Sequence, residues 1–345
     1  MIRRKNVRIK DIAKRLGISG ATVSQALNHP KEVNRSTRQE VLSLCEELGY
    51  AKPLKGKKRT YHIAVISRDS YNFANDFYAK VCEQLLDYAK QQKYNLIFEA
   101  WPDEQDLVPW AISRNRIDGV IILGNILREK ALLIKQQQLP LVLCGHPLPD
   151  VELHTVMPDG KSGSYQACKH LIELGHKRIA TISGGAIFDP VSRDRIEGYR
   201  YALIESGITV AEEYIMIADF HLYSHADKAL EKLLALKEPP TAIVCASDTI
   251  AYRVHETLTA KKITVPREIS LTGFDNFALP EYARGVLPKL TTVEVNVKEL
   301  AKYTLDILYE LMEEPTKVAW RYTLPVKLVA GETTGKPASA GKPKK

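Results

Sequence analysis

The sequence has no apolar run long enough to cross a membrane, and its first residues lack the apolar segment of a secretory signal. It begins instead with basic residues, Arg3, Arg4 and Lys5. Hydrophobic residues make up 45% of the chain and charged residues 26%, which is typical of a globular protein. From these absences we expect a cytoplasmic protein with no membrane partner.

Cysteine is also scarce, and its distribution argues against disulfides and metal sites. The five cysteines are odd in number, widely spaced and each inside an apolar segment: Cys45, Cys82, Cys144, Cys168 and Cys245. Buried reduced thiols are therefore expected. We find no metal-ligand spacing, phosphate-binding loop or nucleophile elbow, and Gly160-Lys161-Ser162-Gly163 fits none of these patterns. We expect no metal, no cofactor and no enzymatic activity.

Positive charge is concentrated at one end of the 345 residues, a length that suits a small module followed by one large or two medium domains. The chain carries a formal charge of +8, but residues 1–60 hold 15 Lys or Arg and 5 Asp or Glu, which is +10. The remaining residues sum to −2. This distribution is expected if the N-terminal part alone meets the phosphate backbone of a nucleic acid.

The N-terminal part carries the pattern of three short helices. The first is marked by apolar residues at helical spacing: Ile9, Ile12, Ala13 and Leu16. Gly17 ends this helix, and Ser19 is placed to cap a second one over residues 20–28. A third helix is expected over residues 36–48, with Asn34 as its cap.

The second helix directs Val23 and Leu27 inward and leaves a small, polar outer face without an acidic group. That face consists of Gly20, Ala21, Thr22, Ser24 and Gln25. A helix, a tight turn and a second helix form the helix-turn-helix plan, in which the second helix enters the major groove of DNA. An ordinary three-helix bundle would show the same spacing, so it is the charge distribution that favours DNA binding.

A domain boundary follows these helices. Pro53 and Gly56 disfavour a stable helix there, and the five basic side chains of the segment favour contact with phosphates or solvent. The composition of the last residues, mostly Gly, Lys, Pro, Ala and Ser, predicts disorder. The expected division is a headpiece at residues 1–50, a linker at 51–61, a core at 62–333 and a disordered tail at 334–345.

From residue 62 onward, short β-branched runs alternate with helical segments. The expected strands are 63–66, 96–98, 119–123, 141–143, 178–182, 214–218, 242–245 and 269–274. The expected helices are 77–92, 104–114, 128–138, 162–174, 195–206, 225–236 and 250–260, the second of them shortened or kinked by Pro109. Continuous apolar strands separated by helices indicate a parallel sheet covered on both faces. We expect two such α/β units in tandem, each a doubly wound parallel sheet.

Open parallel sheets bind ligands beyond the carboxyl ends of their strands, so the residues that follow each strand are candidates for a binding site. They are Arg68, Asp69, Tyr71, Phe73, Phe77 and Tyr78 after the first strand, Asn125 after the third, and Asp189, Arg193, Arg195, Phe220, Ser247, Asp248, Asp275 and Asn276 after later ones. Aromatic rings beside charged groups suit a polyhydroxylated ligand. The CH face of a sugar packs on an aromatic ring, while carboxylate and guanidinium groups bond its hydroxyls.

Some of these candidates have a simpler structural explanation. Asp248 would equally serve to cap the helix that follows it, and Phe77 would fit the core. Arg195 and Asp275 are the strongest candidates for ligand contact, because charged groups at strand ends in a closing cleft need a partner. Two histidines are interpreted as structural: His146 and His176.

Several motifs resemble those of a known family. The matching headpiece segments are Lys10-Asp11-Ile12-Ala13, Gly17-Ile18-Ser19, Ala21-Thr22-Val23-Ser24, Ala26-Leu27-Asn28, Thr37-Arg38 and Glu47-Leu48-Gly49-Tyr50. They are similar to the DNA-binding headpiece of the lactose-repressor (LacI/GalR) family of bacterial transcription regulators. Further similar segments follow in the core at 170–179, 265–270, 273–275 and 290–293. The resemblance therefore covers nearly the whole chain.

The resemblance implies a core like that of periplasmic sugar-binding proteins, in which the chain crosses three times between two subdomains. It places subdomain one at residues 62–157 and 291–319, and subdomain two at 158–290 and 320–333. By resemblance, the residues expected to contact the effector are Phe77, Tyr78, Arg195, Phe220 and Asp275. The strand-end positions add further expected effector-binding residues: Tyr71, Phe73, Asn125, Ser247 and Asp248. Ser247 stands where the family often has Asn, which leaves the identity of the sugar open.

On the DNA side, we expect Gly20, Ala21 and Gln25 to face base edges. Phosphate contacts are expected from Ser19, Thr22, Ser24, Asn28, Asn34, Thr37 and Lys52. The linker is several residues shorter than in the family and keeps only Pro53 and Leu54 of its hinge pattern, so the coupling between core and headpiece is open. The resemblance implies a homodimeric repressor whose affinity for a double-stranded DNA operator is controlled by a small, sugar-like effector. The alternative is a stand-alone sugar-binding module or a regulator that responds to a partner protein.

Overall fold

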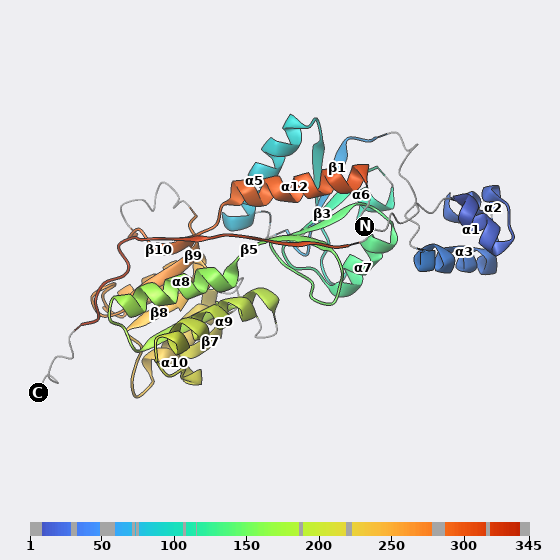
Figure 1. The fold of residues 1–345 in the computed structure, drawn as a ribbon. Helices are drawn as coiled ribbons and strands as arrows, with labels where there is room; N and C mark the ends of the chain where they lie inside the picture. The colour runs from blue at the N-terminus through green and yellow to red at the C-terminus, as the bar shows by residue number, and fades with distance from the viewer. Residues whose placement is uncertain are drawn as a thin grey trace, which may run out of the picture.

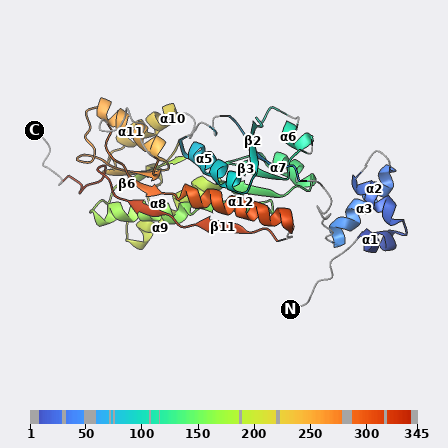
Figure 2. The ribbon, with the colours of Figure 1, turned by 90° about the horizontal axis from the view of Figure 1, so that it is seen from above.

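The computed structural model describes residues 9–28, 33–48, 59–70, 73, 76–105, 108–114, 116–185, 189–218, 223–277, 287–314 and 318–338. Figure 1 shows a small group of helices near the N-terminus and two α/β subdomains that follow one another along the molecule. Figure 2, turned by 90°, shows the same order, with the helical group standing at one end. The predicted fold class is confirmed.

The headpiece consists of α1 (Ile9–Leu16), α2 (Gly20–Asn28) and α3 (Arg35–Leu48). Its core contains Ile12, Ala13, Val23, Ala26, Val41, Leu44 and Cys45. Ser19 Oγ accepts a hydrogen bond from the amide of Thr22 at 3.0 Å, and Asn34 Oδ1 accepts one from the amide of Ser36 at 3.1 Å. Both predicted helix caps are therefore confirmed.

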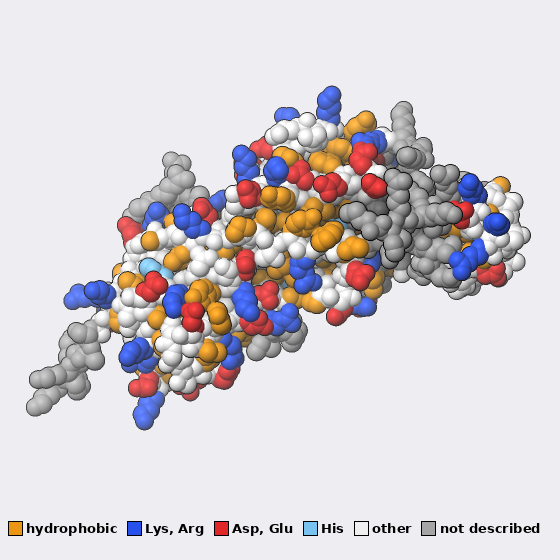
Figure 3. All heavy atoms as spheres, viewed as in Figure 1, with side chains coloured by type: hydrophobic (Ala, Val, Ile, Leu, Met, Phe, Trp, Pro, Cys, Tyr) orange, Lys and Arg blue, Asp and Glu red, His pale blue; other side chains and the backbone are white. Residues whose placement is uncertain are grey.

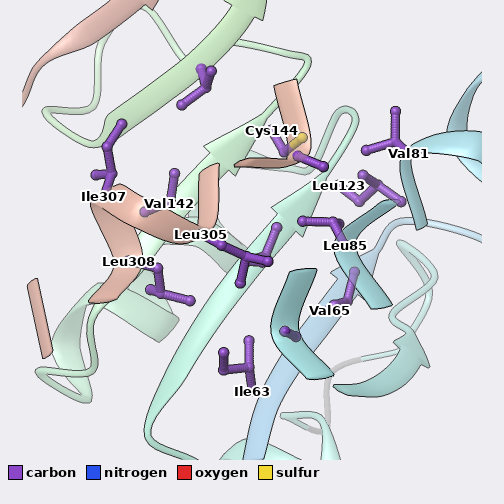
Figure 4. Packing of buried hydrophobic residues seen from close by; sticks show 14 of the residues in the cluster. Ile63, Val65, Val81, Leu85, Leu123, Val142, Cys144, Leu305, Ile307 and Leu308 are labelled. Atoms are coloured by element: carbon purple, nitrogen blue, oxygen red, sulfur yellow. The ribbon is translucent and has the colours of Figure 1, made fainter. Parts of the chain in front are cut away.

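Subdomain one is built on a six-stranded sheet, all parallel, with the order β11-β5-β4-β3-β1-β2. Its strands are β1 (His62–Ser67), β2 (Asn95–Ala100), β3 (Gly119–Leu123), β4 (Leu141–Cys144), β5 (His154–Pro158) and β11 (Arg321–Leu324). α5 (Asp76–Gln91) and α12 (Val297–Glu313) cover one face, and α6 (Trp110–Ser113) and α7 (Arg128–Gln136) cover the other. Figure 4 shows Leu85 of α5 and Leu305 of α12 packing over Val65 and Leu123 of the strands.

Subdomain two is built on a second six-stranded sheet, with the order β12-β10-β9-β8-β6-β7 and only β12 antiparallel. Its strands are β6 (Ile179–Gly184), β7 (Ile215–Ala218), β8 (Ala242–Cys245), β9 (Ser270–Asp275), β10 (Thr291–Glu294) and β12 (Lys327–Val329). α8 (Gly160–Glu173) and α9 (Pro190–Glu205) pack on one face. α10 (Tyr223–Leu234) and α11 (Asp248–Ala260) pack on the other, and the short helix η1 (Glu212–Tyr214) precedes β7.

The chain passes between the two sheets after β5, after β10 and after β11. The predicted division was wrong at two of these strands. β10, assigned to subdomain one, pairs with β9 of the second sheet, and β11, assigned to subdomain two, pairs with β5 of the first. Strands that pair can be far apart in the sequence, so the local pattern of residues did not reveal which sheet β10 and β11 join. α12, between these strands, lies on subdomain one as expected.

Two helices differ from their predicted bounds by more than two residues. Within the described part of residues 104–114, only Trp110–Ser113 is helical, and this helix starts directly after Pro109, which has no amide to donate to a preceding turn. α9 begins at Pro190, five residues earlier than predicted. Asp189 caps it by accepting a hydrogen bond from the amide of Ser192 at 2.8 Å, a start signal that the apolar pattern alone did not show.

The residues after 333 are not all disordered, contrary to the composition-based prediction. The carbonyl of Gly335 accepts a hydrogen bond from His176 Nε2 at 2.9 Å, and its amide donates to Ser270 Oγ at 3.1 Å. Thr334 Oγ1 lies 3.0 Å from His170 Nε2. These partners belong to distant segments, so composition could not identify them. The predicted structural role of His176 is confirmed, and residues 339–345 lie outside the described part.

All five cysteines are buried and free, which confirms their prediction as reduced thiols. Within the described ranges, no group of three or more His, Cys, Asp or Glu side chains is placed to hold a metal ion. None of the helices that the structure describes is long and apolar enough to span a bilayer.

Candidate DNA-binding face and effector site

The outer face of α2 is accessible to a large partner. Its exposed or half-buried residues are Gly20, Ala21, Thr22, Ser24 and Gln25, the set predicted from the sequence. Val23 and Ala26, at 0% and 2% exposure, hold the opposite face of the helix in the headpiece core. α2 contains no acidic residue, so nothing on this helix repels a polyanion.

Polar side chains and cations surround this face. The Ser19 hydroxyl lies 2.8 Å from that of Thr22, and Thr37 is half-buried on α3. The exposed cations of the described headpiece are Lys10, Lys14, Arg15 and Arg38. Figure 3 shows Lys and Arg side chains on the surface of this module. Two predicted DNA contacts, Lys52 and the side chain of Asn28, lie outside the described residues.

Arg195 and Asp275 form the charged centre of the second candidate site. Arg195, on α9, is 8% exposed; its guanidinium carbon lies 4.0 Å from the centre of the Phe274 ring, and it donates a hydrogen bond to the carbonyl of Ala246. Asp275 ends β9 with a φ of 112°. Burial raises the pKa of Asp275 to about 8, although the nearby charge of Arg195 lowers it. The Arg195 guanidinium and the Asp275 carboxyl therefore lie near each other, and the carboxyl is mostly protonated at neutral pH.

Tyr78, on α5 of subdomain one, lies near this charged centre of subdomain two. Burial is the main reason why the pKa of Tyr78 is raised, and the charges of Asp275 and Asp189 raise it further while Arg195 lowers it. The phenol therefore lies near all three charged groups. Behind it, Gly145 has a φ of 87°, and a Cβ at that position would come within 3.1 Å of the Tyr78 ring. Glycine is what allows the ring to lie against the end of β4.

A histidine links the two subdomains directly. His146, which follows β4, places Nε2 2.6 Å from Asp189 Oδ2, and the two side chains are 13% and 21% exposed. Its Nδ1 lies 3.1 Å from the carbonyl of Pro147. Both partners only accept, so both hydrogen bonds form together only when the ring carries two protons. Burial raises the pKa of Asp189, but His146 and the amide of Ser192 outweigh burial and leave the pKa below its ordinary value.

His146 was interpreted as structural from the sequence, and its position across the subdomain boundary was missed. The signal available was its place directly after a strand, where the other candidates also lie. The sequence could not show that His146 contacts Asp189, because the two residues are distant in the sequence and belong to different subdomains.

The other aromatic candidates are divided between the boundary and the core. Phe77 packs against the hydrophobic clusters of both subdomains, and its ring centre lies 5.1 Å from that of Tyr78. Phe73 packs on Phe98, with ring centres 5.5 Å apart, at the edge of the subdomain one core. Asn125 is half-buried after β3. The remaining two, Tyr71 and Phe220, lie outside the described residues.

Ser247 and Asp248 have partners within subdomain two. Ser247 caps α11 by accepting a hydrogen bond from the amide of Ile250 at 3.2 Å. Asp248 is 1% exposed and accepts hydrogen bonds from the hydroxyl of Thr292 at 2.5 Å and from the amide of Phe277 at 3.0 Å. Burial raises the pKa of Asp248 to about 7, and these hydrogen bonds oppose the increase. Asp248 thus holds the loop that follows Asp275.

A helix-turn-helix headpiece joined to a two-subdomain core with a charged boundary defines a DNA-binding regulator with a core suited to sensing a small ligand. Comparison with known proteins agrees. Residues 8–52 match the profile of bacterial regulatory proteins of the lacI family, and residues 168–334 match that of the periplasmic binding protein-like domain.

Individual relatives extend the match over the whole chain. The sequence is 32% identical over 339 residues to catabolite control protein A of Priestia megaterium, covering 95% of this chain and 99% of that protein. The transcriptional regulator CelR–cellobiose complex superposes with a TM-score of 0.69 at 26% identity, covering 95% and 99%. The lac repressor dimer bound to operator and the anti-inducer ONPF shares the fold, with a TM-score of 0.67 at 22% identity, covering 96% and 100%. The chain belongs to the lacI family of bacterial regulatory proteins, which are transcription regulators and not enzymes.

Proposed function

We propose that this protein is a sequence-specific repressor whose operator affinity is controlled by a small sugar or sugar-like effector bound between the two subdomains. The observation that carries the proposal is the placement of buried Arg195 and half-buried Asp275 near each other and near Tyr78 of the other subdomain. A carboxylate and a guanidinium side by side suit a neutral ligand rich in hydroxyls, because each group makes charge-assisted hydrogen bonds to it. We infer that the protein acts in the cytoplasm, where operator DNA is found.

On the DNA side, α2 supplies the groups that read the sequence. Gln25 is the longest polar side chain on its exposed face, and Gln pairs with adenine through two hydrogen bonds in the major groove. Gly20 and Ala21 let the helix approach the base edges. The polar residues Ser19, Thr22, Ser24, Asn28, Asn34, Thr37 and Lys52 would contact phosphates. Two headpieces of a homodimer would then bind the two halves of a palindromic operator.

On the effector side, Phe77, Tyr78, Arg195 and Asp275 form the proposed contact set that the structure describes. His146 and Asp189 join them at the boundary. Tyr71, Phe73, Asn125 and Phe220 remain proposed contacts. Ser247 and Asp248 are proposed to act mainly by holding the loop around Asp275. The CelR complex with cellobiose, which shares this fold, supports a sugar as the ligand class.

Control would follow from how the effector changes the placement of the subdomains. The contact between His146 and Asp189 holds them together in the described structure. An effector that favours one placement shifts the population toward it, by no more than the ratio of its affinities for the two states. By thermodynamic linkage, operator DNA changes effector affinity by the same factor.

The test uses the full chain and a random pool of DNA duplexes. Selection should return a sequence with dyad symmetry, and thermal shift with a sugar panel should return a ligand that raises the melting temperature. That ligand should change the dissociation constant for the selected duplex. A chain lacking residues 1–58 is the matched control, which should keep the thermal shift and lose DNA binding. Sugar binding without any effect on DNA binding would favour a stand-alone sugar-binding module.

A further inference from the structure

The carboxylate of Asp118 fastens the residues that connect the linker to the core to subdomain one. We call residues 59–61 the linker root. Asp118, directly before β3, accepts hydrogen bonds from the amide of Thr60 at 3.0 and 3.1 Å, from its hydroxyl at 3.0 Å and from the amide of Tyr61 at 2.9 Å. The amide of Asp118 in turn donates to the carbonyl of His62 at 2.8 Å. These hydrogen bonds fix the position of the linker root on the core.

The backbone direction at the linker root is also fixed. Tyr61 has a φ of 56°, in the left-handed region that residues other than glycine seldom adopt. Such a conformation persists where surrounding contacts hold it. Here the carbonyl of Tyr61 accepts a hydrogen bond from the amide of Asn95 at 2.9 Å, and its ring centre lies 5.6 Å from that of Tyr94.

One end of α12 lies against the linker root. Glu313, the last residue of α12, forms an ion pair with Arg59. Tyr309, one turn earlier, has its ring centre 5.3 Å from that of Tyr94, which in turn contacts Tyr61. Figure 4 shows Leu305, Ile307 and Leu308 of this helix packed on the first sheet, so α12 is held along its length.

The other end of α12 starts beside the candidate effector site. In the second sheet, Glu294 of β10 lies opposite Asp275 of β9, and its Oε1 accepts a hydrogen bond from the side-chain Nδ2 of Asn276 at 3.0 Å. Asn296 caps α12 immediately afterwards. At 1.5 Å per residue, the helix covers about 25 Å between the strand neighbour of Asp275 and the linker root.

We infer that the linker root, Asp118 and the C-terminal end of α12 form a joint that couples the subdomain boundary to the headpiece. Asp118 is the positioning residue of this joint. It holds the chain so that a shift of α12 changes the direction in which the linker leaves the core, whatever hinge the linker itself forms. The inference rests on the proposed function, since it assumes that the boundary controls DNA binding.

A double-mutant cycle on operator affinity tests the joint without requiring an identified sugar. The probe is the duplex that the full-length wild-type chain selects from a random pool, and the readout is its dissociation constant by fluorescence anisotropy. Asp189→Asn perturbs the subdomain boundary while keeping a residue able to cap α9. Asp118→Asn removes the carboxylate from the joint. Asp87→Asn, at an exposed position of α5, is the charge-matched control.

We expect Asp189→Asn to change the dissociation constant at least fivefold in the wild-type and Asp87→Asn backgrounds, and less than twofold beside Asp118→Asn. Amide exchange at residues 60 and 61 should be at least tenfold faster in Asp118→Asn. Three outcomes would each overturn the joint. Asp189→Asn could change the dissociation constant as much beside Asp118→Asn as in the wild type, it could have no effect in the wild type, or its effect could be lost in the Asp87→Asn background. Failure to select any duplex would overturn the proposed function and the joint with it. If Asp118→Asn does not fold, Glu313→Gln, at an exposed side chain, applies the same criteria.

Discussion

Replacing Asp275 by Asn is expected to remove a pH dependence that the burial of this carboxyl creates. The pKa of Asp275 is about 8 in the folded chain, against 3.8 for an ordinary aspartate. Between pH 4 and pH 8 the folded state therefore keeps a proton that the unfolded state has released, and stability is lost as the pH rises through this window. The slope is at most about 1.4 kcal/mol per pH unit, and Asn, which does not titrate, removes it.

The assay is urea unfolding of the full chain and of Asp275→Asn, followed by far-UV circular dichroism at pH 5 and pH 7.5. The wild type should lose up to about 3 kcal/mol more than the variant between these two pH values. Asp87→Asn, an exposed carboxyl on α5, should behave as the wild type. Equal pH dependence in the wild type and Asp275→Asn would refute the account of a buried, protonated carboxyl.

The same carboxyl fixes the sign of a pH effect on effector binding. Hydroxyl groups of a sugar donate to the ionised form of Asp275, so binding requires loss of the proton. Affinity should therefore rise with pH, up to about 50-fold between pH 6 and pH 8, and protons should be released on binding. Calorimetric titration with a sugar that raises the melting temperature, in two buffers of different ionisation enthalpy, measures the release. Proton uptake would contradict the proposed contact.

Other changes have equally defined outcomes. Gln25→Ala should relax operator preference at one base pair per half-site, by about 1–3 kcal/mol. Gln39→Ala, on the exposed face of α3, should leave the preference unchanged. Duplex selection with each variant measures both outcomes. Asp189→Ala should cost about 1 kcal/mol more folding stability than Asp189→Asn, because Asn still caps α9, and equal losses in thermal unfolding would disprove this reason. His176→Ala should destabilise subdomain two by about 2–4 kcal/mol and expose the residues around Gly335 to proteolysis. An unchanged cleavage rate would contradict the inference that His176 holds Gly335 on the core.

The parts of the fold set by local signals could be predicted from the sequence. The bounds of α2 and β3 agree with the predictions residue for residue, because the Ser19 cap and the apolar run after Asp118 are both local features. Arg195 and Asp275 were also selected from the sequence as the strongest candidates for ligand contact, since each comes after a predicted strand. A rule about strand ends needs no knowledge of which strands are neighbours.

Features that depend on distant partners could not be predicted. β10 and β11 were exchanged between subdomains because short strands carry no mark of the sheet they join. The contact between His146 and Asp189 joins residues from two subdomains, and Gly335 is ordered by His176 and Ser270. In each case the deciding interaction joins segments that are distant in the sequence.

The most direct test of the central claim is the dissociation constant of the full-length chain for its selected duplex, measured with and without a sugar that binds the core. We expect that a duplex with dyad symmetry is selected and that the sugar changes its dissociation constant at least tenfold. A chain that selects no duplex, or a bound sugar that leaves the dissociation constant unchanged, would contradict it.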